Sequence, residues 1–302
     1  MKKYILRIFL FFGIVIAFDF GFGKACELLQ SYARGGRLKN VWQTAMNQEA
    51  NVVIMGSSRA HHHYVPLVFE EELKMTAHNA GVDGNGIVLA TGLYELMSNR
   101  YTPKIIVYDV SLGFDIYMNP KDGNNIRYVG WLRPYFFDKQ VQQLLARVDP
   151  SERYKNISYM FRYNSKIMDL LKDQVVISDY TVDGFAPLQG LMKENIIHTD
   201  DMEFSQIDTL KIKLMEEFIA RISSSDTRLI MIASPLYGVK SSEVFKPIKD
   251  ICQRYGVDFM DYYASPEFQK KQFFNDQSHL NEEGAKVFSK ALASKLQQVN
   301  SK

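Results

Sequence analysis

The sequence predicts an α/β protein built on a mostly parallel, doubly wound sheet of about five strands. Short runs rich in β-branched residues recur along the chain, and most of them lack the in–out alternation of a half-exposed strand. Continuous apolar runs of this length are typical of strands that helices cover on both faces. Helix-like stretches separate the runs, an order that favours parallel strands joined by crossover helices. The strands are expected at residues 52–55, 76–80, 105–110, 229–233 and 257–260.

Stretches of helical length fill the gaps between these runs. The predicted helices cover residues 67–74, 87–97, 207–222, 244–255 and 282–296. One connection, residues 116–205, is too long for an ordinary loop in a compact domain. We therefore expect it to form an insert or cap beside the sheet, with helices of its own near residues 139–147 and 160–172.

The chain begins with an apolar segment next to basic residues. Every residue from Ile8 to Phe18 is apolar or glycine, and if Arg7 and Asp19 are tolerated the run approaches the length of one bilayer crossing. Basic residues at positions 2 and 3 favour a cytoplasmic N-terminus. The segment therefore predicts a signal anchor or a signal peptide.

This segment divides the chain into three predicted parts. Residues 1–24 are the anchor or signal peptide, residues 25–48 a connector, and residues 49–302 the functional domain, which includes the insert. We expect that domain to lie outside the cytoplasm, held to the cytoplasmic membrane by the N-terminal segment. The alternative is a secreted or periplasmic protein released by cleavage.

Composition excludes several other classes of protein. The 302 residues are 46% apolar, which is enough for a sizeable core and excludes a disordered or fibrous chain. The 36 Lys and Arg residues nearly balance the 34 Asp and Glu residues, and no basic stripe is present, which argues against a nucleic-acid partner. The two cysteines, Cys26 and Cys252, are too few for a disulfide framework or a cysteine metal cluster.

Two candidate site segments follow the first two predicted strands, where ligands bind in open parallel sheets. The first strand ends in Gly56-Ser57-Ser58. A serine on a strand-to-helix turn directs its hydroxyl into the crevice, and its backbone N–H lies at a helix N-terminus. The second strand leads into a glycine-rich loop containing Gly84, where bare backbone can approach a ligand and donate to an oxyanion. Taken singly, each pattern also occurs in ordinary turns.

A third candidate segment lies near the C-terminus, where Asp276 precedes His279 by three residues. Within one turn, the carboxylate can bond one imidazole nitrogen and fix the tautomer while the other nitrogen faces a nucleophile. Asn281 and the acidic residues after it are typical of a helix start that would hold this turn in place. Alone, the pattern is more typical of a helix N-terminal turn. Combined with the two earlier segments, it predicts one site at one edge of the sheet.

This combination resembles the SGNH/GDSL hydrolase superfamily of serine esterases and acyltransferases, over residues 50–298 apart from the insert. The resemblance implies a five-stranded flavodoxin-like sheet. By position in the family's first block, it implies Ser58 as the nucleophile. Its last block matches Asp276 and His279 as the remaining members of a catalytic triad.

The oxyanion hole is where the chain departs from the family. The resemblance implies that the backbone N–H groups of Ser58 and Gly84 form the hole. The family's third block normally supplies an asparagine as a further donor, but Phe114 stands in its place here. Either the two backbone groups suffice, or a nearby group such as Asn85 or Ser111 substitutes.

The resemblance implies a serine esterase acting on O-acyl esters, for example acetyl esters, of an extracytoplasmic glycan or cell-envelope polymer, without a cofactor. The N-terminal segment and the altered third block look most like envelope members, among them the D-alanyl transfer proteins of teichoic acid and alginate-type O-acetyltransferases. Two alternatives stay open: an O-acyltransferase of the same fold, and a non-catalytic envelope binding or assembly protein. A cytoplasmic esterase whose first segment is a core helix is a weaker third.

The run from His61 to His63 invites a metal hypothesis. Three consecutive residues do not converge from one face of a helix or strand, and no carboxylate stands at ligand spacing nearby in the sequence. We therefore expect no metal site and a place for the run on the surface or at the rim of the crevice. Asp83 is expected to form a turn, and Arg59 to form a surface ion pair or to orient an anionic group.

Overall fold

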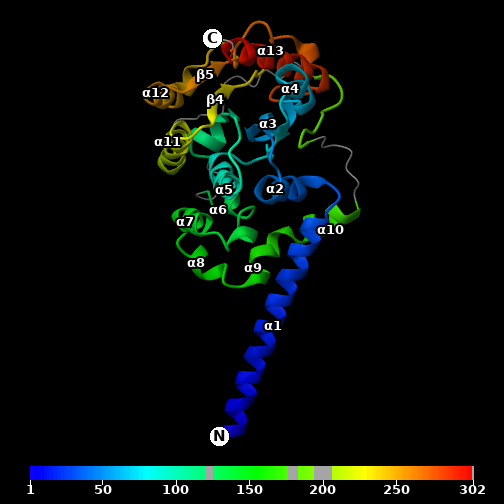
Figure 1. Ribbon diagram of the computed structural model, residues 1–302, viewed down its shortest axis with the longest axis vertical. Helices are drawn as coiled ribbons and strands as arrows, with labels where there is room; N and C mark the ends of the chain where they lie inside the picture. Colours follow the sequence, from blue (N-terminus) through cyan, green and yellow to red (C-terminus); the bar gives the residue numbers. More distant parts are fainter. Residues whose placement is uncertain (120–124, 176–182, 194–205, 301–302) are drawn as a thin grey trace.

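A five-stranded, wholly parallel sheet forms the centre of the computed structural model (Figure 1). The structure describes residues 1–119, 125–175, 183–193 and 206–300. The strand order is β2-β1-β3-β4-β5, the flavodoxin-like order, so the predicted fold class is confirmed. The strands are β1 (Val52–Gly56), β2 (Ala77–Asn79), β3 (Ile105–Asp109), β4 (Arg228–Ala233) and β5 (Asp258–Asp261).

The register of the sheet brings the strand ends together. Gly56 at the end of β1 pairs with Asp109 at the end of β3, and Asp109 pairs in turn with Ile232 of β4. Because all the strands run in the same direction, the segments that follow them leave from one edge of the sheet. β1 also pairs with β2 on its other side, Ile54 with Asn79, so the segments after β1 and β2 begin as neighbours.

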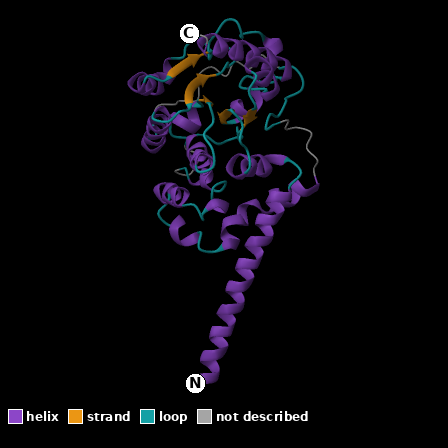
Figure 2. Cartoon of the chain, viewed as in Figure 1, coloured by secondary structure: helices purple, strands orange, loops and turns teal. Residues whose placement is uncertain are grey.

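Helices cover both faces of the sheet, as Figure 2 shows. Alternate residues of a strand point to opposite faces, so Met55 and Ile54 of β1 belong to two different hydrophobic cores. One core is closed by α2 (Gly36–Met46), α5 (Ile87–Ser98), α11 (Thr209–Ser223) and α12 (Lys246–Tyr255). The other is closed by α3 (Ser58–His63), α4 (Pro66–Leu73) and α13 (Glu282–Asn300).

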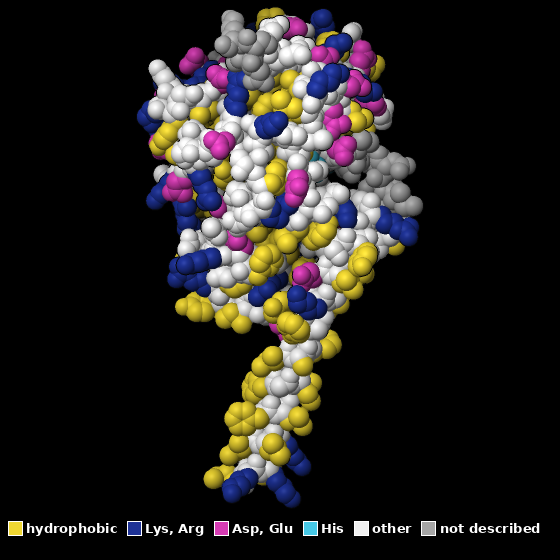
Figure 3. Space-filling model, in the orientation of Figure 1, with side chains coloured by type: hydrophobic (Ala, Val, Ile, Leu, Met, Phe, Trp, Pro, Cys, Tyr) yellow, Lys and Arg dark blue, Asp and Glu magenta, His cyan; other side chains and the backbone are white. Residues whose placement is uncertain are grey.

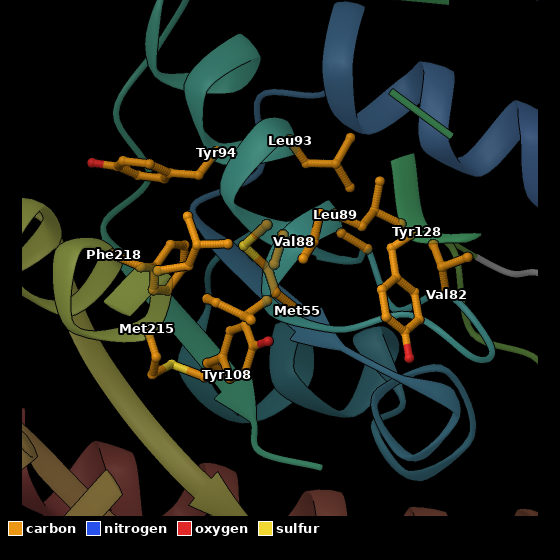
Figure 4. Close-up of a cluster of buried hydrophobic side chains, with 14 of the residues drawn as sticks. Met55, Val82, Val88, Leu89, Leu93, Tyr94, Tyr108, Tyr128, Met215 and Phe218 are labelled. Atoms are coloured by element: carbon orange, nitrogen blue, oxygen red, sulfur yellow. The ribbon is translucent and has the colours of Figure 1, made fainter. Parts of the chain in front are cut away.

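Figure 4 shows part of the first core. Met55 and Tyr108 project from the strands toward Val88 of α5 and toward Met215 and Phe218 of α11, and all five are at most 2% exposed. The burial of both strand faces explains why the runs in the sequence lack alternation. β5, at the edge of the sheet, is the exception, since most of its residues are at least partly exposed.

The N-terminal helix α1 (Lys2–Tyr32) extends away from the body as one continuous helix (Figure 1). It is long and apolar enough to cross a membrane, with a mean hydropathy of 2.2 over a window of 18 residues, none of which is buried. These properties are consistent with a membrane anchor or a signal sequence. The helix continues past residue 24 and enters the body, where Gly23, Cys26 and Gln30 are buried.

The described part of the insert forms a helical layer beside α1 and α5 (Figure 1). Its helices are α6 (Ile126–Val129), η3 (Arg133–Tyr135), α7 (Lys139–Val148), α8 (Glu152–Lys155), α9 (Tyr159–Tyr163), η4 (Asn164–Lys166) and α10 (Ile167–Val175). The helix predicted at 160–172 is therefore three short elements. A 3₁₀ turn at Asn164–Lys166 interrupts it, where Asn and Ser favour local hydrogen bonds over helix continuation. Residues 120–124, 176–182 and 194–205 of the insert lie outside the described residues.

Three shorter helical segments complete the described structure: η1 (Leu112–Ile116), η5 (Glu243–Phe245) and η6 (Lys271–Phe273). The first is a π-helical turn directly after β3. The last precedes the loop that carries Asp276 and His279. Asn281 caps α13, because its side-chain oxygen accepts a hydrogen bond from the N–H of Gly284 at 2.9 Å.

Candidate active site

Ser58 is the first residue of α3 and follows β1 by a single residue. The turn that places it depends on Gly56, whose φ of +141° is a conformation that side chains rarely adopt. A Cβ at Gly56 would also lie 2.6 Å from the carbonyl oxygen of Asp109 on the neighbouring strand. A glycine at this position therefore allows the chain to turn sharply and to direct Ser58 out of the sheet edge.

The carboxylate of Asp276 shapes the loop that presents His279. One carboxylate oxygen accepts hydrogen bonds from the backbone N–H of Ser278 at 2.7 Å and of His279 at 2.9 Å. The loop closes where the N–H of Asn275 donates to the carbonyl oxygen of His279, also at 2.9 Å. The same carboxylate lies 2.9 Å from Nδ1 of the His279 ring. The spacing of three residues thus fixes both the backbone and the imidazole.

The segment that carries Ser58 and the loop that carries His279 are in direct contact. Nε2 of His279 lies 2.8 Å from Oγ of Ser58, although 221 positions separate the two residues. An ionised Asp276 accepts the Nδ1 proton of His279, which leaves the lone pair of Nε2 to accept a hydrogen bond from the Ser58 hydroxyl. The structure therefore brings together, in one hydrogen-bonded chain, the three residues that the sequence analysis singled out.

The surroundings of Asp276 favour the ionised form of its carboxyl group. Burial raises the pKa of Asp276, but the hydrogen bond and charge of His279 and the backbone N–H groups outweigh burial, so the net pKa is lowered. The side chain of His279 is 23% exposed and that of Asp276 is 54% exposed. The imidazole is thus largely shielded while the carboxylate remains in contact with water.

His63 hydrogen-bonds to the backbone of the loop that carries His279. Its ring is fully buried, its Nε2 accepts a hydrogen bond from the N–H of Leu280 at 3.0 Å, and its Nδ1 lies 3.1 Å from Oγ of Ser234. Burial lowers the pKa of His63 well below its usual value, so the ring is neutral and can accept that bond. His63 therefore links α3, which carries Ser58, to the residue after His279.

His61 and His62 converge on one carboxylate, which the sequence reasoning did not anticipate. Nδ1 of His61 lies 2.8 Å from the Asp83 carboxylate, and Nε2 of His62 lies 3.3 Å from the same oxygen. The other nitrogen of His62 lies 2.6 Å from the carbonyl oxygen of Ala186. Both nitrogens of His62 thus face acceptors, so its imidazolium form satisfies both. The one signal that the sequence offers is the adjacency of Asp83 to Gly84, and this pair predicts a turn.

The pKa shifts of this group agree with its geometry. Burial lowers the pKa of His62, but the hydrogen bonds to Asp83 and Ala186 raise it by more, so the net pKa is raised. Burial raises the pKa of Asp83, whereas the two histidines lower it by more, so the net pKa is lowered. His61, His62 and Asp83 have donor atoms within 4.8 Å of one another and could hold a cation such as zinc, but these atoms already pair with one another.

Segment 183–193, from the end of the insert, runs beside this site. The N–H of Asn79 at the end of β2 donates to the carbonyl oxygen of Asp183, and the N–H of Ala186 donates to that of His61. Further along, the N–H of Met192 donates to the carbonyl oxygen of Phe274, in the loop before Asp276. This segment therefore ties together the end of β2, α3 and the His279 loop.

Gly84 lies on the loop that packs against the start of α3. Its φ is +67°, and a Cβ there would lie 3.2 Å from the guanidinium of Arg127, at the start of α6. Arg127 thus brings a cationic group from the insert next to the predicted oxyanion donor, a contribution that nothing in the sequence signals. Asn85, considered as a substitute donor, is buried and donates its side-chain N–H to the carbonyl oxygen of Asp83.

The segment after β3 has a structural role in this structure. The ring of Phe114 packs edge-on against Tyr128 at 6.1 Å. Asp115 is fully buried and accepts hydrogen bonds from the N–H of Ser111 and of Ile87, which ties the segment to the start of α5. Burial raises the pKa of Asp115 to about 6, against the opposing effect of these hydrogen bonds.

The expectation for Arg59 is wrong. Its side chain is 7% exposed and lies 3.6 Å from the fully buried carboxylate of Asp109. It also donates a hydrogen bond to the carbonyl oxygen of Val110. Arg59 follows Ser58 on α3, so its side chain turns back toward the ends of the strands instead of outward. It forms a buried ion pair beneath the site.

A separate cavity of about 230 Å³ lies between α5, α7 and α11. Its walls include two ion pairs, Arg221 with Glu95 and Arg147 with Glu217. Ser58 is not among the residues that line it. The cavity is thus distinct from the hydrogen-bonded chain of Ser58, His279 and Asp276.

Replacing Asp83 by asparagine is expected to lower the pKa of His62, because the substitution removes the charge that stabilises the imidazolium. NMR titration of the histidine ring protons in the full chain in detergent micelles measures this change. The His78 ring, buried next to Thr44 with a pKa lowered by burial to about 4, is the internal control and should be unaffected. An unchanged His62 titration would contradict the assigned network.

The same linkage has a consequence for stability. Because folding raises the pKa of His62, its contribution is fully present below the unfolded value near 6.5 and is lost as pH rises through the folded value. Denaturant unfolding across this pH range should show that loss in the wild-type chain. The Asp83→Asn variant should show a weaker dependence.

Comparisons with known proteins show only distant likenesses. The sequence matches no protein-family model and no curated protein. One similar solved structure is a gut microbial enzyme that metabolises diltiazem, with 12% identity and a TM-score of 0.39 over 81% of this chain. The match covers 46% of that enzyme, so this chain corresponds to less than half of its length. Another is a protein from Streptococcus pneumoniae described as a platelet activating factor, with 14% identity and a TM-score of 0.38 over 96% of this chain and 99% of that one. Likenesses of this strength establish neither a family nor an activity.

Proposed function

We propose that this protein is a serine esterase of the SGNH type that hydrolyses O-acyl esters. The observation that carries the proposal is the hydrogen-bonded chain from Ser58 through His279 to Asp276, with 2.8 Å between hydroxyl and imidazole. That distance lies within the range over which an imidazole can take a proton from a hydroxyl. The position of Ser58 at a strand-to-helix turn also supports its proposed role as the nucleophile, since the attacking oxygen then points away from the sheet.

The proposed reaction proceeds in two halves. Oγ of Ser58 attacks the ester carbonyl carbon while Nε2 of His279 takes the hydroxyl proton, and Asp276 stabilises the resulting imidazolium. The tetrahedral intermediate collapses, the C–O bond to the alcohol breaks, and His279 gives its proton to the departing alcohol. Water then attacks the acyl-enzyme and loses a proton to His279. The carboxylic acid leaves, and Ser58 regains its hydroxyl hydrogen.

The oxyanion of each intermediate needs donors close to Ser58. The backbone N–H groups of Ser58 and Gly84 are the proposed pair, the first at the start of α3 and the second on the loop beside it. Arg127 adds a positive charge next to Gly84 and would favour negative charge there. This cation offers a physical reason why the site tolerates Phe114 at a position where the family has an asparagine donor.

The proposed substrate is an acylated glycan or cell-envelope polymer, and the proposed place is the outer side of the cytoplasmic membrane. The long exposed apolar helix α1 supports the anchor, and the basic residues at its start favour a cytoplasmic N-terminus. The same acyl-enzyme would make the protein an O-acyltransferase if a sugar hydroxyl replaced water as the acceptor. Hydrogen bonding of Ser58 to an imidazole favours either reaction over a purely binding role.

Incubating the full chain in detergent micelles with a fluorophosphonate probe tests this proposal, since such probes react with activated serines. We expect covalent labelling of the wild-type protein and hydrolysis of p-nitrophenyl acetate. An unlabelled wild-type protein would contradict the enzyme proposal and favour the binding alternative. Product analysis with and without a carbohydrate acceptor separates hydrolysis from transfer.

His63 is expected to act as a positioning residue for His279. Replacing His63 by leucine removes the acceptor for the N–H of Leu280, so the imidazole of His279 should lose its alignment with Ser58. A misplacement of about 1 Å can cost about a hundredfold in rate, and we expect a slowing of fluorophosphonate labelling up to that size. Labelling rates in folded protein, checked by circular dichroism, measure the effect.

The His63→Gln variant is the matched control, because its amide oxygen can accept the same hydrogen bond. It should recover most of the labelling rate that the leucine variant loses. If both variants label at the wild-type rate, His63 does not position His279. If both fail equally while remaining folded, the lost interaction is not the hydrogen bond to Leu280.

A further inference from the structure

The exposed apolar part of α1 is about as long as a bilayer is thick. Its side chains are exposed from Tyr4 to Phe18, and Gly23 is its first buried residue. At a rise of about 1.5 Å per residue, residues 4–22 span about 28 Å. The hydrocarbon core of a bilayer is about 30 Å thick. If α1 spans a membrane, no length of it remains to hold the body away from the lipid.

Asp19 connects α1 to the body near the C-terminal end of the exposed apolar stretch. Its carboxylate accepts hydrogen bonds from Oγ of Ser158 and from the backbone N–H groups of Tyr159 and Met160, at 2.7 to 2.9 Å. A side chain of α1 therefore satisfies N–H groups at the start of α9 that the helix itself leaves unpaired. The rings of Phe20 and Tyr159 pack edge to face at 5.4 Å. The start of α9 is thus held beside the end of the apolar stretch.

Large apolar side chains are exposed on the body at the same level. Tyr154 is 75% exposed, Ile157 68% and Met160 40%. Ile157 directly precedes Ser158, and its N–H donates to the carbonyl oxygen of Tyr154, so the three residues share one short stretch of α8 and α9. Figure 3 shows hydrophobic side chains at the lower end of the body, near the point where α1 leaves it. We name these three residues the underside patch.

We propose that the underside patch rests in the headgroup layer of the same bilayer that α1 spans, so that the body lies against the membrane. The proposal deepens, and rests on, the membrane anchoring in the proposed function. The argument for lipid as the occupant is continuity, because the patch begins where the exposed apolar surface of α1 ends. Tyrosine is a side chain that favours the membrane interface, since its ring is apolar and its hydroxyl polar.

Charge around the patch agrees with lipid headgroups as the neighbour. Arg153 and Lys155 flank Tyr154 on α8 and both are exposed, and Nζ of Lys155 also lies 3.0 Å from the carboxylate of Asp149. Basic side chains close to a membrane surface are attracted to anionic headgroups. The patch therefore has the composition of an interfacial contact, with apolar and aromatic groups in the middle and cations beside them.

Collisional quenching by spin-labelled lipids tests the proposal in the full chain reconstituted in phosphatidylcholine–phosphatidylglycerol vesicles. An environment-sensitive fluorophore is attached at Ile157→Cys, and the matched control is Val287→Cys on α13, at the opposite end of the body (Figure 1). Val287 is 39% exposed, and the native cysteines Cys26 and Cys252 are buried, so the introduced thiols should react first. We expect lipids labelled near the headgroup to quench the probe at position 157 several-fold and to leave the probe at position 287 unquenched.

The outcomes separate this proposal from the anchor itself. If carbonate washing leaves the protein in the vesicles but quenching at position 157 is no greater than at position 287, the contact of the body with the bilayer is refuted while the anchor stands. If carbonate washing releases the protein, the anchor is refuted and this proposal falls with it. Neither result bears on labelling of Ser58, which is measured separately.

Discussion

Replacing Ser58 by alanine is expected to abolish covalent labelling by a fluorophosphonate and to lower ester hydrolysis by about a millionfold in kcat. The size follows from serine hydrolases in which the nucleophile acts as one unit with its base, so that losing it removes the contribution of the whole triad. Oγ of Ser58 is the oxygen within hydrogen-bond distance of Nε2 of His279. Probe labelling and p-nitrophenyl acetate hydrolysis in the same preparation measure the loss.

Ser57 provides the matched control. It precedes Ser58 in the same turn, but its hydroxyl is buried and has no hydrogen-bond partner among the described residues. Ser57→Ala removes an unsatisfied polar group, so it should preserve folding and labelling. Labelling that survives Ser58→Ala but disappears in Ser57→Ala would show that Ser57, and not Ser58, is the nucleophile. Labelling that survives both substitutions would remove this site from the reaction.

Replacing Phe288 by alanine is expected to lower the free energy of unfolding by about 3–5 kcal/mol, the usual range for a large buried aromatic side chain. Phe288 is fully buried on α13, and its ring packs edge-on against Tyr64, Tyr262 and Phe268 at 5.2 to 5.4 Å. The cavity left by alanine would remove all three ring contacts at once. Denaturant unfolding of the full chain in detergent, followed by tryptophan fluorescence, measures the change.

Val287→Ala, at the neighbouring position on the same helix, is the control for this experiment. Val287 is 39% exposed, so its truncation should change the free energy of unfolding by less than about 0.5 kcal/mol. Equal effects of the two substitutions would mean that α13 is not docked through Phe288. Because the loop carrying His279 runs into α13, the Phe288 variant should also slow labelling of Ser58 at temperatures where part of the protein is unfolded.

The fold was predictable because its signals are local. Each strand is a continuous apolar run, and burial of both faces of strands such as β1 and β3 is what produces such runs. The prediction of one continuous helix at 160–172 was wrong. Its apolar positions fit a helical period, but Asn164 and Ser165 favour a turn. The period reports which face is buried, whereas the polar pair decides where the helix stops.

The candidate site was predictable only in part, because its residues differ in how they are positioned. Ser58, Asp276 and His279 follow recognisable turns, so local sequence identifies them. His63 and Asp83 are brought to the site by tertiary contacts, with Leu280 and with two histidines, that no spacing in the sequence encodes. Arg127 comes from the insert, so its place beside Gly84 depends on how that layer packs.

Separation in sequence between Ser58 and His279 has a consequence for biosynthesis. The ribosome makes the part of the chain that carries Ser58 first, and His279 follows 221 residues later. A nascent chain therefore carries Ser58 without its imidazole partner until His279 has been made, and the proposed ester chemistry can begin only after the two segments have met. Termination before residue 275 would remove both residues and also α13, which closes one of the two cores of the sheet.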